Sequence, residues 1–291
     1  MRKKERKRFL PETVQLLFNV VDEDDVVDEN VSLPPVIPLQ CTMDNIRDNY
    51  SLCLQYWEEG VERTALLNLV LKVLNGGELS AAERMQYKYM RSRYKHLRFS
   101  QRLYSKSHTS RFLFSKTTVF LGRFQDAFRN ENKQSVKHYG RLLRFYLSAP
   151  VWAWVSNSLR RIQLETVDDF MAYRQAQMRL LQGLLIKPQL TGEEFHSARK
   201  IISQQVSYYD TIRAIRPDNQ DARQISRFLA AINGLMGDRH DEMVRDNLAG
   251  LNSYQRPSQL DNNIRQRLEL FLSRFPLQDL TRPDAGATIW Q

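Results

Sequence analysis

Apolar residues recur at helical spacing through most of this chain, and few residues interrupt the pattern. The 291 residues include only 11 glycines and 10 prolines, and valine and isoleucine seldom alternate with polar residues over the length of a strand. Proline interrupts a helix because it lacks an N–H and clashes with the preceding turn. From residue 42 onward the pattern predicts an all-α fold of about eight to ten helices, whose short connections favour antiparallel bundles. Four prolines fall between the periodic segments: Pro150, Pro188, Pro217 and Pro257.

Local signals mark where several of these helices begin and end. Ser80 and Glu83 have the spacing of a capping box, in which the two side chains satisfy backbone N–H groups at a helix start. Thr166 with Asp169, and Thr191 with Glu194, repeat the pattern. The sequence Asn75-Gly76-Gly77 is typical of a helix end, because glycine adopts the left-handed conformation there easily.

Two stretches 88 residues apart each open a predicted helix with a histidine on its polar face, His108 and His196. A similar landmark follows each, at residues 147–155 and 236–244. From His108 to Val155 is 47 steps, and from His196 to Val244 is 48. This period predicts a duplicated helical unit. The predicted organisation is a partly disordered, charged and proline-rich arm over 1–41, an N-terminal helical extension over 42–100, helical bundle repeats over 101–190 and 191–276, and a C-terminal tail over 277–291.

Composition narrows the possible functions. The net charge of +10 and isoelectric point near 9.6 favour an anionic partner. No apolar run is long enough to cross a membrane, and no apolar stretch suggests a secretory signal, so we expect a cytoplasmic protein. Two cysteines, Cys41 and Cys53, are too few for a disulfide scaffold or a zinc site. With no glycine-rich phosphate loop and no His-Glu-x-x-His motif, we expect no enzyme activity, metal or cofactor.

The helix predicted from Thr191 has two different faces. Ile201 and Ile202 lie on its apolar face, and the opposite, polar face carries His196, Arg199, Lys200, Ser203, Gln204 and Ser207. A histidine in the first turn can join free backbone N–H groups in holding an anion, and arginine clamps phosphate oxygens with its planar fork. These features predict a basic surface that binds a polyanion. The candidate binding residues are His108, Arg111, Lys116, Arg141, Arg144, His196, Arg199, Lys200 and Arg239.

This order of motifs resembles the CHAD family (conserved histidine α-helical domain) over roughly residues 100–275. The sequence His196-Ser-Ala-Arg199-Lys200 is similar to the family's His-x-x-Arg-Lys opening, and residues 235–244 resemble its Leu-Gly-x-x-His/Arg-Asp-x-x-Val element. The resemblance implies two helical bundles related by an internal repeat and a basic central groove for inorganic polyphosphate. In the first half, Val151 and Trp152 replace the family's Arg-Asp pair. This departure implies that polyphosphate binding is weakened or redirected.

Two other functions fit the sequence. The tract 84–111 carries nine lysines and arginines with no acid between them, interleaved with tyrosines and phenylalanines. This mixture suits single-stranded nucleic acid, although an amphipathic helix with inward tyrosines fits it too. A helical scaffold that binds a protein partner is the other alternative. The candidate nucleic-acid residues are Arg84, Lys88, Arg91, Arg93, Lys95 and Arg98.

Overall fold

The computed structural model describes residues 6–23 and 30–277 and confirms an all-α fold. Within those residues there are eleven helices and two strands of two residues each, which pair antiparallel. The helices are α1 (Pro11–Glu23), α2 (Met43–Gly60), α3 (Arg63–Leu74), α4 (Ala81–Tyr104), α5 (Phe112–Arg129), α6 (Lys133–Tyr146), α7 (Ala149–Arg160), α8 (Val167–Leu185), α9 (Gly192–Ile215), α10 (Gln220–Leu248) and α11 (Asn262–Arg274), and the strands are β1 (Gln189–Leu190) and β2 (Ser258–Gln259).

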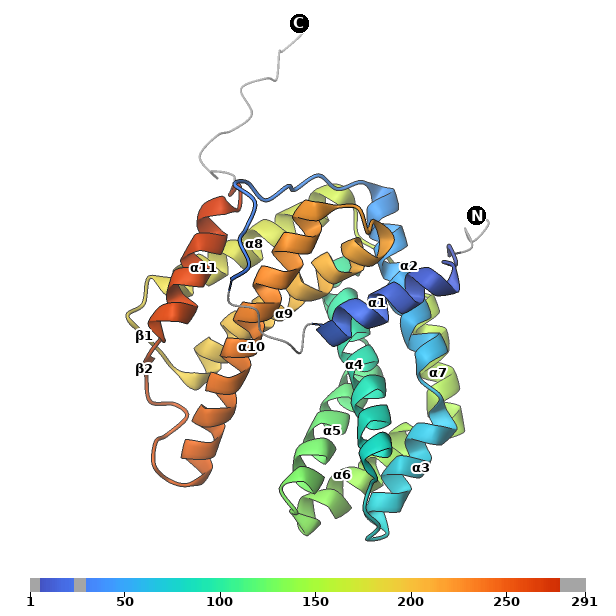
Figure 1. The fold of residues 1–291 in the computed structure, drawn as a ribbon. Helices are drawn as coiled ribbons and strands as arrows, with labels where there is room; N and C mark the ends of the chain where they lie inside the picture. The colour runs from blue at the N-terminus through green and yellow to red at the C-terminus, as the bar shows by residue number, and fades with distance from the viewer. Residues whose placement is uncertain (1–5, 24–29, 278–291) are drawn as a thin grey trace, which may run out of the picture.

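The helices form two groups that converge at one end of the molecule (Figure 1). Helices α2 to α7 lie on one side, and α8 to α11 lie on the other. The groups meet where α4 and α2 pack on α9, and α1 lies across this junction against α9 and α2. One hydrophobic cluster runs from Leu33 to Phe275 through both groups, so the two sides share a core.

Helix α9 is the central element of the fold. Every residue from 201 to 211 is buried, because α1, α4, α8 and α10 all pack against this helix. The sequence predicts a polar face on this helix for holding an anion, but Ser203, Gln204 and Ser207 of that face are buried among other helices. Each bonds to a side chain of another helix: Ser203 Oγ donates to Asn233 at 2.6 Å, Tyr173 donates to Gln204 at 3.0 Å, and Ser207 Oγ lies 3.3 Å from His96 Nδ1.

The helix boundaries follow the local signals closely. Ser80 and Glu83 form a full capping box at the start of α4, as do Thr191 and Glu194 at the start of α9. Helix α3 ends at Leu74 and the chain turns at Gly76 with φ of 87°. Positive φ carries little penalty for glycine, so the turn forms there.

The N-terminal segment, predicted as a partly disordered arm, packs on the rest of the protein over its described residues. Helix α1 packs on α9 and α2, with Leu17 fully buried. In the proline-rich stretch, Leu33 and Ile37 are buried, and the Ile37 N–H donates to the Arg274 carbonyl at 2.9 Å. Residues 24–29, which hold most of the acidic run, lie outside the described part of the chain, as do the first five residues and the predicted tail beyond 277.

Two further features qualify the predicted organisation. The boundary proposed at residue 100 falls within α4, which contacts both groups of helices. The two landmark segments also differ: Leu147 and Ser148 end α6 and begin α7, whereas residues 236–244 lie inside the continuous helix α10. Across the described ranges, no helix combines the length and apolar character needed to cross a membrane.

Candidate polyanion site

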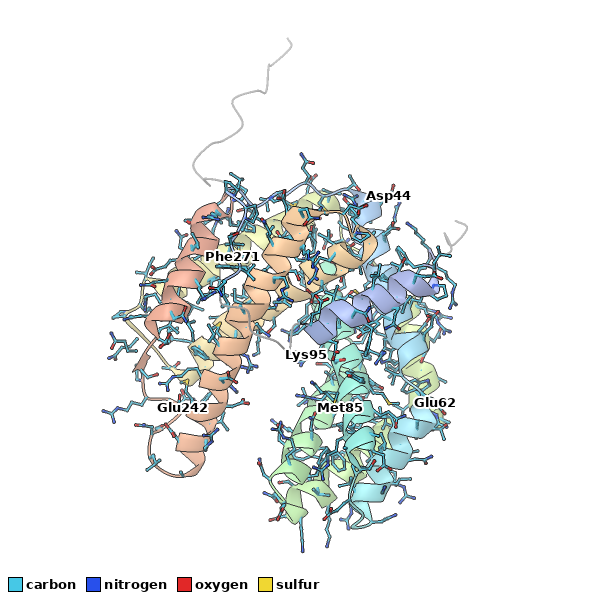
Figure 2. All side chains as sticks on the ribbon, in the orientation of Figure 1. Asp44, Glu62, Met85, Lys95, Glu242 and Phe271 are labelled. Atoms are coloured by element: carbon cyan, nitrogen blue, oxygen red, sulfur yellow. The ribbon has the colours of Figure 1, made fainter. Side chains whose placement is uncertain are left out.

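A group of basic side chains gathers where α4 passes the first turns of α9. Spacings of seven and four residues place Arg91, Arg98 and Arg102 on one stripe of α4. We call these three, together with His196, Arg199 and Lys200 of α9, the central basic cluster. Lys95, between Arg91 and Arg98 on α4, marks the place in Figure 2, where the two groups of helices converge.

Burial and the charges of neighbouring cations lower the pKa of several side chains in the cluster. Burial lowers the pKa of Lys200, and the guanidinium groups of Arg102 and Arg98 lower it further. Burial likewise lowers the pKa of Arg98, and Arg102 adds to the effect. For Arg199, burial lowers the pKa, Asp241 opposes the change and Arg91 strengthens it. Cations from two helices therefore share a region that is partly removed from water, where like charges repel strongly.

His196 lies in the middle of the cluster. Burial, followed by the charges of Lys200, His240, Arg199 and Arg98, lowers the pKa of His196 to about 4. Its ring lies 5.0 Å from the ring of His240 on α10, centroid to centroid. His240 is oriented in turn by Tyr254, whose hydroxyl lies 3.1 Å from its Nε2. At neutral pH His196 is an uncharged ring with one N–H to donate.

Several buried donor and acceptor atoms of the cluster are unsatisfied. Among the described residues, Arg98 Nε, Arg102 Nε and His196 Nδ1 are buried and have no hydrogen-bond partner. Buried polar groups normally find partners, so such atoms need an explanation. The arrangement suits a ligand that brings several oxygen acceptors.

Two glycines on neighbouring helices make room for the ends of the cluster. A Cβ at Gly237 of α10 would lie 3.1 Å from Arg199 Nη2, and a Cβ at Gly122 of α5 would lie 3.1 Å from Arg91 Nη2. Arg91 also donates from Nη1 to Gln125 at 3.2 Å. The guanidinium groups are thus held against helix backbone on both sides of the junction, which limits the conformations they sample.

Carboxylates accompany the cluster mainly at one end. Asp241 and Asp238 are near enough to Arg199 to act on its pKa, and Arg91 acts on the pKa of Asp126. Near Lys200, Glu193 opposes the effect of the arginines. The arginines at the other end, Arg98 and Arg102, form no ion pair with any described residue.

His108 does not open a helix, which corrects the sequence prediction. It sits in the loop before α5 with φ of 48°, and α5 begins at Phe112. Its ring stacks on Tyr173 at 3.8 Å between centroids, its Nδ1 lies 3.0 Å from the Arg102 carbonyl oxygen, and its Nε2 lies 3.8 Å from a Glu165 carboxylate oxygen. His108 is therefore near the Arg102 end of the cluster, but its ring is engaged by protein groups.

The remaining residues predicted for the site lie elsewhere. Arg111 caps α5 and is exposed, and the Lys116 ammonium lies 5.4 Å from the Phe112 ring on the same helix. Arg141 and Arg144 are exposed on α6, which packs on α3, α5 and α7. Arg239 pairs with Glu242 at 2.5 Å and borders a hollow beside Ser258. The structure thus joins only the α9 residues of the prediction to the α4 stripe.

The basic tract proposed for nucleic acid is divided between several environments. Tyr87, Tyr94 and Tyr104 are buried in the core, so their rings cannot stack on bases. The Arg93 guanidinium lies over the rings of Tyr56 and Phe18, at 4.9 and 5.0 Å from their centroids. Arg84 Nε donates to the Leu79 carbonyl at 3.0 Å. Lys88 and Lys95 border a cavity of about 150 Å³ that Asp22 also lines.

Sequence reasoning missed two members of the site as binding residues. Arg102 belongs to the α4 stripe and was visible at helical spacing, seven residues after Lys95 and four after Arg98. His240 neighbours the cluster and lies within the segment 235–244, and only the packing of α10 on α9 brings it to His196.

None of the family models, curated proteins and solved structures compared with this chain matches it. In the described part of the chain, no three histidine, cysteine, aspartate or glutamate side chains are placed to hold a metal ion. What the site can do therefore follows from its geometry and charge.

Proposed function

We propose that this protein binds a polyanion of the polyphosphate type at the central basic cluster, without catalysing a reaction. The observation that carries the proposal is the packing of α4 on α9, which brings the α4 arginines close enough to lower the pKa of Arg199 and of Lys200. Such an arrangement costs folding free energy, because like charges are brought together and partly desolvated. A ligand with several phosphates would remove that cost.

The unsatisfied atoms support the same proposal. Arg98 Nε and Arg102 Nε can each donate to a phosphate oxygen, and charge-assisted bonds of this kind are roughly twice as strong as neutral ones. A chain of phosphates suits a row of cations better than a single compact anion does, because the row follows α4 from Arg91 to Arg102 and is joined there by cations of α9.

We also propose that the chain is a divergent relative of the CHAD family, with two related helical bundles. Support comes from the residues 196–200, which resemble that family's motif and lie in the cluster, and from the two groups of helices on either side of it. The different settings of the two landmark segments weigh against a close structural repeat.

Binding of long-chain polyphosphate to the full chain, measured by calorimetry at about 50 and 200 mM salt, tests the proposal. We expect wild type to bind with an affinity that falls as salt rises. The double variant Arg98→Gln, Arg102→Gln and the variant His196→Ala, Arg199→Ala should each lose affinity by about tenfold or more.

The control variant is Arg111→Gln, Lys116→Gln. Like the α4 variant it removes two positive charges, but from exposed positions outside the cluster. We expect it to bind within about threefold of wild type, because it leaves all the direct contacts in place. Failure of wild type to bind at the lower salt would reject the proposal in favour of a protein-binding scaffold. Equal losses in the control and cluster variants would reject the cluster as the site.

A further inference from the structure

A second basic surface covers the outer face of α6. At 3.6 residues per turn, its charged residues and one aromatic ring fall within an arc of about 140°. No aspartate or glutamate occurs between Lys133 and Tyr146. We call this surface the α6 face. It comprises Lys133, Gln134, Lys137, His138, Arg141, Arg144 and Phe145, all of them exposed.

The opposite side of α6 fixes the helix to the protein. Gly140 and Leu143 are buried, and a Cβ at Gly140 would lie 2.9 Å from Leu74 Cδ1 and 3.1 Å from Phe124 Cε2. This close packing against α3 and α5 means that the apolar side of α6 is already covered by protein. The cations of the α6 face therefore sit on a rigid helix.

The charges of the α6 face are uncompensated. Lys133, Lys137, Arg141 and Arg144 form no ion pair and no side-chain hydrogen bond with any described residue. From Lys133 to Arg144 they span eleven residue steps, or about 16 Å of helix. A linear row of fixed cations attracts a polymer of negative charge, because several counterions are released together when it binds.

Phe145 gives this face its particular character. Its side chain is 61% exposed, and it follows Arg141 by four residues, which places the two side by side on the same face of the helix. An exposed ring among cations is the combination that binds single strands, because bases stack on the ring while lysine and arginine follow the phosphates. Inorganic polyphosphate has nothing that stacks, so the ring distinguishes the two polymers.

We infer that the α6 face binds single-stranded nucleic acid. Insertion into a membrane is disfavoured, since a membrane-binding helix needs a broad exposed apolar face and that of α6 is buried. The surface is separate from the central basic cluster, which lies on α4 and α9, whereas α6 packs on α3, α5 and α7. It is also distinct from the tract 84–111, whose tyrosines at 87, 94 and 104 are buried.

Fluorescence anisotropy with labelled dT and U oligonucleotides of about 20 nucleotides tests the inference, using the full chain at several salt concentrations. We expect Phe145→Leu to weaken oligonucleotide binding about fivefold or more with little change in salt dependence, because stacking is lost and charge is kept. The same variant should bind polyphosphate as wild type does. Arg141→Gln, Arg144→Gln should weaken oligonucleotide binding and also flatten its salt dependence.

Two matched variants complete the experiment. Arg111→Gln, Lys116→Gln removes two exposed charges elsewhere, and Arg98→Gln, Arg102→Gln removes two from the central basic cluster; both should keep the Phe145-dependent part of oligonucleotide binding. All substitutions on the α6 face are at exposed positions, and circular dichroism verifies that the variants are folded. Undiminished oligonucleotide binding by Phe145→Leu overturns the inference. So does competition by polyglutamate as effective as that by unlabelled oligonucleotide, which would indicate an acidic protein partner instead.

Discussion

The rings of His196 and His240 lie 5.0 Å apart, centroid to centroid, one on α9 within the central basic cluster and the other on α10. Burial is the main cause that lowers the pKa of each histidine, and the charge of nearby cations lowers both values further. Folding therefore favours the neutral form of both rings, compared with a histidine in the unfolded chain.

Titration of His196 by NMR should give a pKa of about 4 in the free protein. Because this value lies below that of the unfolded chain, the unfolded state binds more protons between these values, and His196 lowers stability as the pH falls through that window. Binding of polyphosphate should raise the pKa of His196, since phosphate oxygens favour the charged ring. A pKa unchanged by saturating polyphosphate would place the ligand away from His196.

Arg98→Met should make the protein more stable while weakening polyanion binding. Methionine keeps much of the apolar packing of the arginine side chain and removes a charge repelled by Arg102 and Lys200. We expect the free energy of unfolding to rise by about 0.5–1 kcal/mol at low salt, and the gain to shrink as salt screens the cluster. Urea denaturation at two salt concentrations measures both effects, and a loss of stability with this variant would contradict the repulsion described above.

Glu23→Gln should loosen α1. Glu23 accepts from Arg213, a nearly buried residue of α9, at 2.8 Å, and Arg227 lies 3.6 Å from the same oxygen. Loss of the carboxylate leaves Arg213 without this partner, at a cost of about 1–2 kcal/mol after allowance for the exposure of Glu23. Hydrogen exchange of α1 amides should accelerate. The control Asp48→Asn breaks the exposed pair with Lys7 and should cost less than about 1 kcal/mol.

Gly192→Ala should disturb the hydrogen bond between Tyr254 and His240. A Cβ at residue 192 would lie 2.6 Å from ring atoms of Tyr254, which must then move away from His240. We expect a loss of about 1–2 kcal/mol in stability, as for other overpacked sites, together with a change in the NMR signals of His240. Gly183→Ala is a suitable control, because nothing lies within 4 Å of a Cβ there. If both variants behave alike, the contact with Tyr254 carries no structural role.

Local sequence signals sufficed for the helices and their capped ends. The capping boxes at Ser80 and Thr191, and the turn at Gly76, depend on residues at most three positions apart. The start of α5 was misplaced because His108 is held by Tyr173 and Glu165, more than fifty residues away in the chain.

The same limit applies to the candidate site. Ser203, Gln204 and Ser207 look like solvent-facing residues until Asn233, Tyr173 and His96 are brought to them by packing. Stripes of basic residues on α4 and α9 were visible as helical spacing. The packing of the helices determines that these two stripes meet. It also determines that Arg141 and Arg144 lie on a different surface.

The crossing of α4 and α9 is also the junction between the two groups of helices (Figure 1). A polymer bound to cations of both helices would restrict rotation of one group of helices against the other. Relative motion would then decrease across the whole molecule, including at the ends of α5 and α10, which lie away from the bound polymer.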